Sequence, residues 1–405
     1  MKRLAFLSVL LLCAAGLVCS LDFGLVISQE IESENEYFDV ENIHFAYTPS
    51  FTPWFSWDSG GKVSIYISNR FFLEYNYYSY NELATGWAVP VFKTELTYSA
   101  INFRINDTMS LEGGRIEYDD TIGFVASGLF DGIRFKAEIS KSAINVGVFY
   151  TGLLYRETAL IWMTYNDIER YYEPWDWDDS LEYCFASKRI LTDVRWDMSI
   201  TEAFALSAEF LAQIDVNNDE DIQKLHSEYI EAKVVFHPVS TLEITGGFLF
   251  EFMQDEKANN SSAFGFLAGM KTGVPGSLND MLKLNIKFTT GPWNEDSIAF
   301  TPINSVAQGD IFFMDISSLF YPSVDYSVRL HHTLLAEGSF RYYVNTDSDA
   351  ENNAYGGELW ASITWQPVDD IRLKVGGGVF LPDMGNVYKD SDPMWRVDAV
   401  FTLSL

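Results

Sequence analysis

The strongest constraint on the fold is an extended stretch with one unbroken apolar side, residues 395–405, at the end of the chain. Side chains alternate between the two faces of a strand, so this stretch has an apolar and a polar face. The apolar face carries Trp395, Val397, Ala399, Phe401, Leu403 and Leu405, and the polar face carries Arg396, Asp398, Thr402 and Ser404, with Val400 the one exception. A bare edge of this kind aggregates in water and is not tolerated in lipid. We therefore expect the stretch to pair with the first strand, which begins at Leu21, and to close a barrel.

The same alternation recurs along the whole chain. The clearest examples are residues 63–68, 133–139, 204–214, 230–236, 283–288 and 371–381. No stretch after residue 20 shows a helical period. A tilted spanning strand takes about 10 residues, so 385 residues predict roughly 16 to 18 strands. The sequence thus predicts one all-β domain, residues 21–405, folded as a single closed antiparallel transmembrane β-barrel.

Residues 1–20 have the pattern of a cleaved secretory signal peptide. Lys2 and Arg3 precede an apolar run from Leu4 to Val18, and small residues follow. A single membrane anchor is the alternative, but the run is short and alternation begins immediately after it. Lipidation of Cys19 is a further alternative, for which residues 16–18 match poorly.

The composition agrees with an outer-membrane barrel and disfavours several other classes. The chain has 57 acidic and 27 basic residues, whereas a nucleic-acid partner would require a basic face. Aromatic residues make up 16% of the chain, which suits two interfacial girdles. Cys184 is the only thiol after the signal peptide, so we expect neither an internal disulfide nor a cysteine metal cluster. We expect no cofactor.

The connections between the predicted strands are of two kinds. Residues 236–242 and 365–371 repeat one Pro-Val turn, and residues 320–326 look like a looser third copy. Longer acidic segments alternate with these turns, as do the outer loops of a bacterial outer-membrane barrel. An even strand number then places both termini on the periplasmic side. Ser297–Phe320 is the least strand-like region, and we expect it to fold inward and narrow the pore.

Two stretches resemble the alginate-export and OprD-like family of outer-membrane porins. The resemblance is carried by Gly114, Arg115, Tyr118 and Asp120 in residues 111–120, and by Phe130, Asp131, Gly132 and Arg134 in residues 128–135. Residues 356–405 are a weaker match, and the composition also resembles that of spirochaetal proteins. The resemblance implies a monomeric barrel of about 18 strands with a solute-conducting pore. The family's namesake has an arginine-rich lumen, whereas this chain has few arginines.

The polar faces of the strands are expected to line the pore. The candidate lining residues are Arg134, Lys136, Glu138, Glu209, Glu231, Lys233, Lys283, Lys287, Arg372, Lys374, Arg396 and Asp398. Eight are basic and four are acidic, while most acidic residues fall in loops. Fixed charges set the selectivity of a pore, so this wall favours anionic or polar solutes behind an acidic outer rim. The alternative is that acids and bases pair across strands and leave a weakly selective hole.

Other candidate sites are weaker. Asp215, Asn217, Asp219 and Asp221 have the spacing of a calcium loop but lack its glycine and final glutamate, so a surface loop is favoured. The acidic aromatic loop 173–182 could hold a sugar or a cation, or lie at the membrane interface. His331 and His332 should face opposite ways on one strand, and no Gly-x-Ser-x-Gly elbow is present, so we expect no enzyme.

The sequence therefore predicts a passive outer-membrane channel through which small polar or anionic solutes diffuse. Its expected partners are outer-membrane lipid, such solutes, and the barrel-assembly machinery through the C-terminal strand, with no nucleic acid. The alternative is a surface-exposed structural or host-binding barrel whose lumen is blocked. A soluble secreted β-protein is a third class.

Overall fold

The fold is seen in a computed structural model. It describes residues 20–35, 38–80, 84–164, 167–168, 184–216, 224–255, 260–274, 276, 279–292, 298–347 and 351–405. The predicted signal peptide up to Cys19 lies outside these ranges.

Antiparallel strands account for nearly all the regular structure in the described residues. The strands are β1 (Ser20–Asn35), β2 (Ile43–Asp58), β3 (Val63–Tyr80), β4 (Ala84–Trp87), β5 (Val91–Leu96), β6 (Ser99–Asn106), β7 (Met109–Asp119), β8 (Ser127–Ile139), β9 (Ser142–Tyr150), β10 (Arg189–Thr201), β11 (Phe204–Asp215), β12 (Leu225–Val239), β13 (Leu242–Asp255), β14 (Ser261–Val274), β15 (Asp280–Thr289), β16 (Leu319–His331), β17 (Leu334–Asn345), β18 (Ala354–Val368), β19 (Ile371–Leu381) and β20 (Met394–Ser404). One turn of helix, α2 (Arg156–Ala159), and one 3-10 turn, η2 (Pro382–Met384), complete the set.

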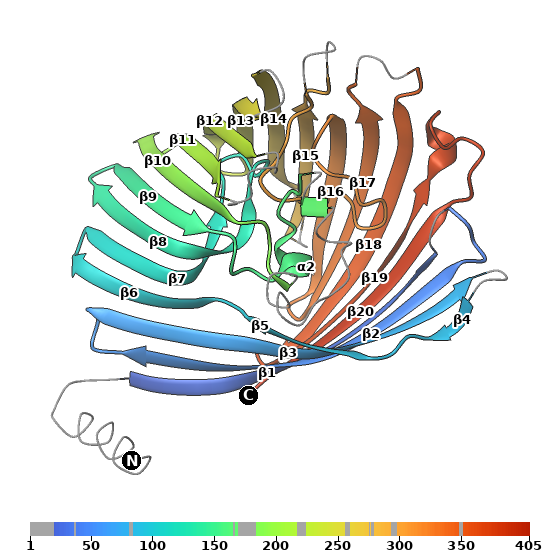
Figure 1. The fold of residues 1–405 in the computed structure, drawn as a ribbon, viewed down its shortest axis with the longest axis horizontal. Helices are drawn as coiled ribbons and strands as arrows, with labels where there is room; N and C mark the ends of the chain where they lie inside the picture. Colours follow the sequence, from blue (N-terminus) through green and yellow to red (C-terminus); the bar gives the residue numbers. More distant parts are fainter. Residues whose placement is uncertain are drawn as a thin grey trace.

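The sheet closes on itself through its first and last strands. β1 pairs with β20 from Val26–Ser404 to Glu34–Arg396, and the backbone N–H of Leu405 donates to the carbonyl of Leu25 at 2.8 Å. Figure 1 shows the C-terminus beside β1. The expected pairing of the terminal stretch with the first strand is therefore confirmed. Closure leaves no open edge at this seam, as lipid requires.

One strand of the wall is interrupted. β4, β5 and β6 pair with successive parts of the same strand β3, and only β6 also pairs with β7. These three segments together occupy one position in the wall. The described residues thus form a closed antiparallel barrel of 18 wall strands, within the expected range.

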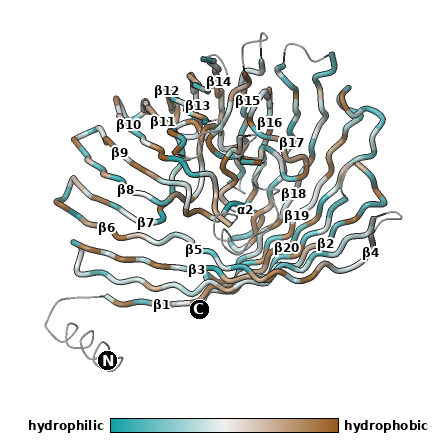
Figure 2. The backbone as a smooth tube through the Cα atoms, viewed as in Figure 1, coloured by the Kyte–Doolittle hydropathy of each residue, from teal (hydrophilic) through white to brown (hydrophobic). Residues whose placement is uncertain are grey.

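The outer face of the wall is apolar. Figure 2 shows hydrophobic and hydrophilic residues alternating along the strands. Exposed large apolar side chains include Phe51, Phe55, Ile133, Val148, Phe210, Ile230, Phe248, Ile286, Leu359, Ile363 and Val397. Apolar side chains have no favourable interaction with water, so an outer face of this kind suits contact with the hydrocarbon of a membrane. Among the described residues, the search for a helix long and apolar enough to cross a membrane found none.

The two Pro-Val sequences form hairpin turns, as predicted. β12 ends at Val239 and β13 starts at Leu242, while β18 ends at Val368 and β19 starts at Ile371. The third predicted turn is wrong, because residues 320–326 lie inside β16. Pro322 is tolerated there because the ladder between β16 and β17 skips it, so its missing N–H costs no hydrogen bond.

Candidate functional site

All twelve candidate lining residues lie on the polar face of their strands, opposite the exposed apolar side chains. On β8, for example, Arg134 and Lys136 alternate with the exposed Ile133, and on β20 Arg396 and Asp398 flank the exposed Val397. The polar face is the inner one, because it also contacts segments that lie inside the barrel. That these residues line a conducting pore stays a prediction.

The first of these inner segments is the turn after β7, residues 120–126. The carboxylate of Asp120 accepts hydrogen bonds from five successive backbone N–H groups, those of residues 122–126, at 2.7–3.2 Å. Two buried glutamates of the wall hold the turn in place. Glu209 accepts from the backbone N–H of Thr121 at 2.7 Å, and Glu231 accepts from that of Ile122 at 3.1 Å. These two candidate lining residues therefore anchor a loop and lie beneath it.

The second inner segment, residues 298–318, confirms the predicted inward fold of this region. The backbone N–H of Thr301 donates to Glu251 at 3.0 Å. Further along the segment, Glu358 accepts from three successive N–H groups, those of residues 310–312, at 2.9–3.1 Å. Hydrogen bonds to buried carboxylates are strong, so these two contacts fix the segment to the wall.

The two inner segments pack against each other and against the wall. The N–H of Ile303 donates to the carbonyl of Val125 at 2.7 Å. Apolar side chains of both segments form a buried cluster with wall residues from several strands. This cluster includes Ile122, Phe124, Val125, Leu191, Leu211, Tyr229, Leu249, Phe300, Ile303, Ile311, Phe312, Tyr343 and Phe380. Part of the barrel interior is therefore filled by an apolar core.

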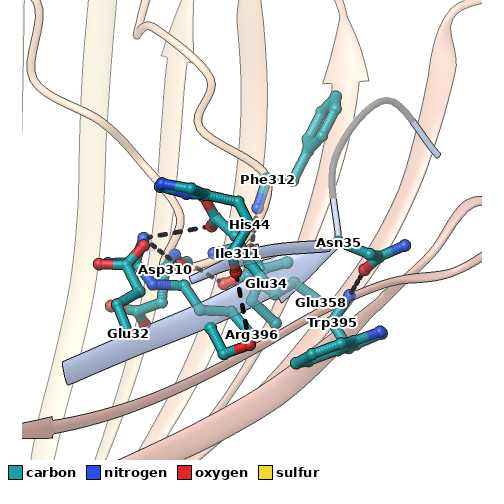
Figure 3. A network of polar contacts seen from close by, with 11 residues as sticks. Glu32, Glu34, Asn35, His44, Asp310, Ile311, Phe312, Glu358, Trp395 and Arg396 are labelled. Carbon is teal, nitrogen blue, oxygen red and sulfur yellow. Dashed lines mark hydrogen bonds and ion pairs between the residues drawn. The ribbon is translucent and has the colours of Figure 1, made fainter. Parts of the chain in front are cut away.

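Figure 3 shows the polar contacts where the second segment meets the closing seam. Arg396 on β20 donates to the carboxylate of Glu32 on β1 at 2.7 Å and to the carbonyl of Asp310 at 3.3 Å. The side-chain oxygen of Asn35 accepts from the backbone N–H of Trp395 at 2.5 Å. Arg396 thus links the first strand, the last strand and the inner segment. The carboxylate of Glu32 largely neutralises its charge.

The cations on one side of the lumen, the β7–β10 wall, are paired with carboxylates. Arg134 contacts Glu112 at 2.6 Å, and Lys136 contacts Glu138 at 2.8 Å. Arg195, which the sequence reasoning did not single out, contacts Asp197 at 3.1 Å. Five of these six side chains, all but Glu138, border a cavity of about 450 Å³. Here the acids and bases offset one another, as in the alternative prediction of a weakly selective wall.

The opposite side, the β15–β19 wall, differs. Among the described residues, Lys283 and Lys374 have no carboxylate oxygen within 4 Å. Both border a cavity of about 370 Å³. Lys287 donates to the side-chain oxygen of Gln308 at 2.8 Å, and so faces the second inner segment. Arg341, also missed from the sequence although it alternates with the aromatic residues Phe340 and Tyr342, donates to Glu358 at 2.6 Å and to Asp310.

The three remaining candidates, Lys233, Arg372 and Asp398, have no ion-pair partner in the described part of the chain. Lys233 is on β12 opposite Ser207 and Gly247, Arg372 is an exposed residue at the start of β19, and Asp398 lies opposite Gly376.

The family-motif residues come together on β7 and β8, where they stabilise the wall. Arg115 and Asp131 are direct cross-strand neighbours and form a two-point ion pair at 2.7 and 2.9 Å. Arg115 also donates to the carbonyls of Leu96 and Leu153, at 2.9 and 2.8 Å. Leu96 ends β5, whose edge on this side has no strand partner among the described residues. The arginine thus clasps the interrupted strand to β7.

The other motif residues provide space and support for this clasp and for the first inner segment. Gly114 and Gly132 are opposite one another, and Gly114 has a φ of +130° that disfavours a side chain. A Cβ at Gly132 would lie 2.4 Å from the carbonyl oxygen of Val148. The hydroxyl of Tyr118 donates to Glu209 at 2.6 Å, and its ring packs edge-on against Phe130. The motif residues therefore have structural roles, apart from Arg134, which lies in the lumen.

The weaker candidate sites gain no support. Asp215 accepts from the backbone N–H of Leu225 at 3.3 Å, while Asn217, Asp219, Asp221 and loop 173–182 lie outside the described residues. The described residues contain no group of histidine, cysteine and acidic side chains that could hold a metal. The expectation that His331 and His332 face opposite ways is wrong. β16 ends at His331 and the chain turns there, which brings the two rings within 3.9 Å of each other.

Comparisons with known proteins support the fold. No family model matches the chain, and no curated protein matches it in sequence. Solved structures of Pseudomonas aeruginosa outer-membrane porins match nearly the whole chain. OccK7 (OpdD) has 12% identity, covers 95% of this chain and 99% of its own, and has a TM-score of 0.62. OpdK with vanillate has 12% identity, coverage of 95% and 98%, and a TM-score of 0.60. OprD has 11% identity, coverage of 95% and 95%, and a TM-score of 0.57. The chain therefore has the fold of an OprD-like outer-membrane porin.

Proposed function

We propose that the protein is a passive outer-membrane channel for small polar or anionic solutes. The observation that carries the proposal is the pair of unneutralised cations, Lys283 and Lys374, beside a cavity inside a closed barrel. An unpaired charge on a pore wall attracts solutes of opposite sign. The β7–β10 wall offers polar but largely neutralised groups, which suits passage without tight binding.

Three further points support this proposal. The fold is that of porins, and one similar barrel, OpdK, was crystallised with vanillate, an organic anion. The exposed apolar face fits outer-membrane lipid. The motif of residues 111–134 is in keeping with alginate-export porins, although the wall carries too few arginines to suggest a long polyanion. We place both termini on the periplasmic side, and infer that the barrel-assembly machinery recognises the C-terminal strand.

A second candidate is a structural or host-binding barrel with a blocked lumen. The apolar core formed by residues 120–126 and 298–318 favours it, because these segments fill part of the interior. In that case the outer loops would carry the structural or host-binding function, and the cations beside the cavity would have no solute to attract.

Conductance of the refolded chain in planar bilayers tests the proposal. We expect stepwise current and, in a salt gradient, a reversal potential that shows anion preference. Preference for cations would contradict the role given to Lys283 and Lys374. A folded barrel that inserts but carries no current would favour the blocked lumen.

A deletion tests whether the second inner segment narrows the path. Removing residues 303–309 takes out Asn304 and Gln308, both of which contact other parts of the lumen. We expect higher conductance with the barrel intact. An unchanged conductance would show that solutes pass elsewhere.

A further inference from the structure

The seam between β7 and the interrupted strand is paired along only part of its length. β7 pairs with β8 from its first residue to its last, but with β6 only as far as Arg115. Beyond Arg115, the neighbouring position in the wall belongs to β5. In the part of the chain that the structure describes, β5 pairs with β3 and with no other strand. The half of this seam nearer the outer loops therefore has two open backbone edges, one on β5 and one on β7.

Arginine side chains take the place of a strand partner along these edges. Arg115 donates to the carbonyl of Leu96 on β5 at 2.9 Å, and to the carbonyl of Leu153 at 2.8 Å. Arg134 donates to the carbonyl of Glu117 on β7 at 3.0 Å. Backbone groups cannot remain unbonded in hydrocarbon, so such contacts let an unpaired seam lie in a membrane. Because side chains hold it, the seam can separate without breaking a ladder of backbone hydrogen bonds.

Residues 151–160, which include α2, lie against the inner side of this seam, and we call them the cover. Near the start of the cover, Leu154 is buried in the apolar core that the inner segments form. Directly after the cover, Ile161 forms an antiparallel bridge with Asn304 of the second inner segment. The cover is therefore anchored in the barrel interior at both ends.

The middle of the cover is joined to β5 by polar side chains. Glu157 on α2 forms an ion pair with Lys93, and the hydroxyl of Thr158 donates to the carboxylate of Glu95. The side chain of Glu157 is half-exposed, and ion pairs that water reaches contribute little to stability. These contacts close the seam but can be broken at low cost.

Apolar side chains are exposed on both faces of the wall at this seam. On β5, Val91 is 46% exposed and Phe92 is 61% exposed. Neighbouring residues of a strand point to opposite faces, and Val91 shares the inner face with Lys93, which contacts the cover. Leu160 of the cover is 50% exposed. Phe92 suits contact with lipid, whereas Val91 and Leu160 offer apolar surface on the inner side, where a polar solute would find no partner.

We propose that the seam between β5 and β7 is a lateral passage from the lumen to the outer leaflet, closed by the cover, for single-chain amphiphiles. The alkyl chain contacts Phe92, Val91 and Leu160, and the polar head stays in the lumen beside Lys93 and Glu95. Small polar solutes take the axial path instead. This inference goes beyond the proposed channel function, since it requires only that the barrel lies in a membrane.

Photolabelling of the refolded full chain in lipid vesicles tests the passage. The probe is hexadecanol with a diazirine close to its hydroxyl group. It is poorly soluble in water and therefore reaches inner side chains from the bilayer. We expect label on Phe92 at the outer face and also on Val91 and Leu160. Label confined to the outer face would overturn the proposal.

A disulfide between the cover and β5 should close the passage. Glu95→Cys/Thr158→Cys is made in a Cys184→Ser background, so that only the introduced thiols can pair. In the oxidised form, labelling of the inner side chains should fall at least about fivefold, and reduction should restore it. The matched control, Val235→Cys/Thr245→Cys, joins two neighbouring strands of a paired seam and should change nothing. Equal inner labelling in the oxidised and reduced forms would refute the passage.

A second variant covers the case in which the disulfide does not form. Glu157→Gln/Thr158→Val weakens the contacts between the cover and β5, so inner labelling should rise severalfold. Glu243→Gln removes a comparable exposed contact, with His237 near a short turn, and should leave the labelling unchanged. Inner labelling that stays at the parent level in the first variant would contradict the role of the cover.

Conductance separates this inference from the proposed channel. The oxidised and reduced forms of the Glu95→Cys/Thr158→Cys variant should conduct alike, because small ions take the axial path. If the disulfide lowered conductance and labelling together, the probe would enter along the axis, and the lateral passage would be wrong. A barrel that carries no current but shows inner labelling that the disulfide abolishes would refute the channel and keep the passage.

Discussion

The two sides of the lumen carry similar side chains but differ in what surrounds them. On the β7–β10 wall, Arg134, Lys136 and Arg195 each have a carboxylate within about 3 Å. On the β15–β19 wall, Lys283 and Lys374 have none within 4 Å in the described part of the chain. A paired charge acts on a distant ion as a dipole, whereas an unpaired charge acts at full strength. This difference shows that the selectivity of a pore depends on which charged side chains have no partner of opposite charge. A count of basic residues alone does not predict it.

Reversing the unpaired charges should have the largest effect. In Lys283→Glu/Lys374→Glu, four units of charge change beside the path. One unit at about 8 Å contributes about 0.5 kcal/mol in a water-like dielectric, so the anion-to-cation permeability ratio should fall by at least about tenfold. Reversal potentials in a potassium chloride gradient measure this ratio. Lys136→Glu on the β7–β10 wall changes two units beside Glu138 and should shift the ratio less; an equal shift per charge would remove the distinction between the two walls.

The ion pairs of the β7–β10 wall should contribute more to the stability of the barrel than to its selectivity. Arg115→Met leaves Asp131 without its partner and the carbonyls of Leu96 and Leu153 without a donor. Breaking a buried ion pair from one side costs about 3–5 kcal/mol. Urea unfolding of the refolded barrel should show a loss of that order, whereas Lys283→Met should unfold like the parent protein. Similar stabilities of the two variants would show that Arg115 does not clasp β5 to β7.

The anchors of the inner segments offer a third comparison. Glu358→Ala removes the acceptor of three backbone N–H groups and one partner of Arg341. Charged hydrogen bonds contribute about 1.5–3 kcal/mol each, so residues 310–312 should detach from the wall. We expect a noisier and roughly twofold higher single-channel conductance. Glu209→Ala removes the wall contact of residues 120–126 instead. Because Asp120 still holds that turn together internally, the conductance of this variant should change less.

The barrel itself could be predicted from the sequence because its signals are local. Period-two alternation and Pro-Val turns depend on neighbours a few residues apart, and both terminal strands show the alternation. Residues 120–126 were not foreseen as an inner segment, since their wall acceptors Glu209 and Glu231 lie far along the chain and meet them only through the closed sheet. The interruption between β4, β5 and β6 likewise depends on pairing with β3.

The site could be predicted only in part. Alternation placed all twelve candidate residues on the inner face, and it could also have found Arg341 and Arg195, which follow the same pattern. It could not show that Glu209 and Glu231 are covered by a loop. The motif residues were noticed through resemblance, yet their roles as clasp and loop anchor follow from contacts across strands. Whether Lys283 pairs with its neighbour Asp325 is a question of side-chain direction that no spacing answers.

The smallest expected effect concerns Asp315, which lies in the second inner segment and accepts from the hydroxyl of Ser305. Burial raises the pKa of Asp315 above its ordinary value of 3.8, so the folded segment binds this proton more tightly than the unfolded chain. The stability that the proton contributes is complete below pH 3.8 and is lost as the pH rises through the higher folded value. Asp315→Asn should therefore make backbone hydrogen exchange across residues 305–316 severalfold slower at neutral pH, and should flatten its dependence on pH once intrinsic rates are removed. Asp369→Asn, in the exposed turn between β18 and β19, serves as the matched control and should leave this exchange unchanged. If Asp315→Asn instead speeds exchange at neutral pH, the ionised carboxylate supports the segment. The second inner segment would then depend on charge for its structure, as the β7–β10 wall does.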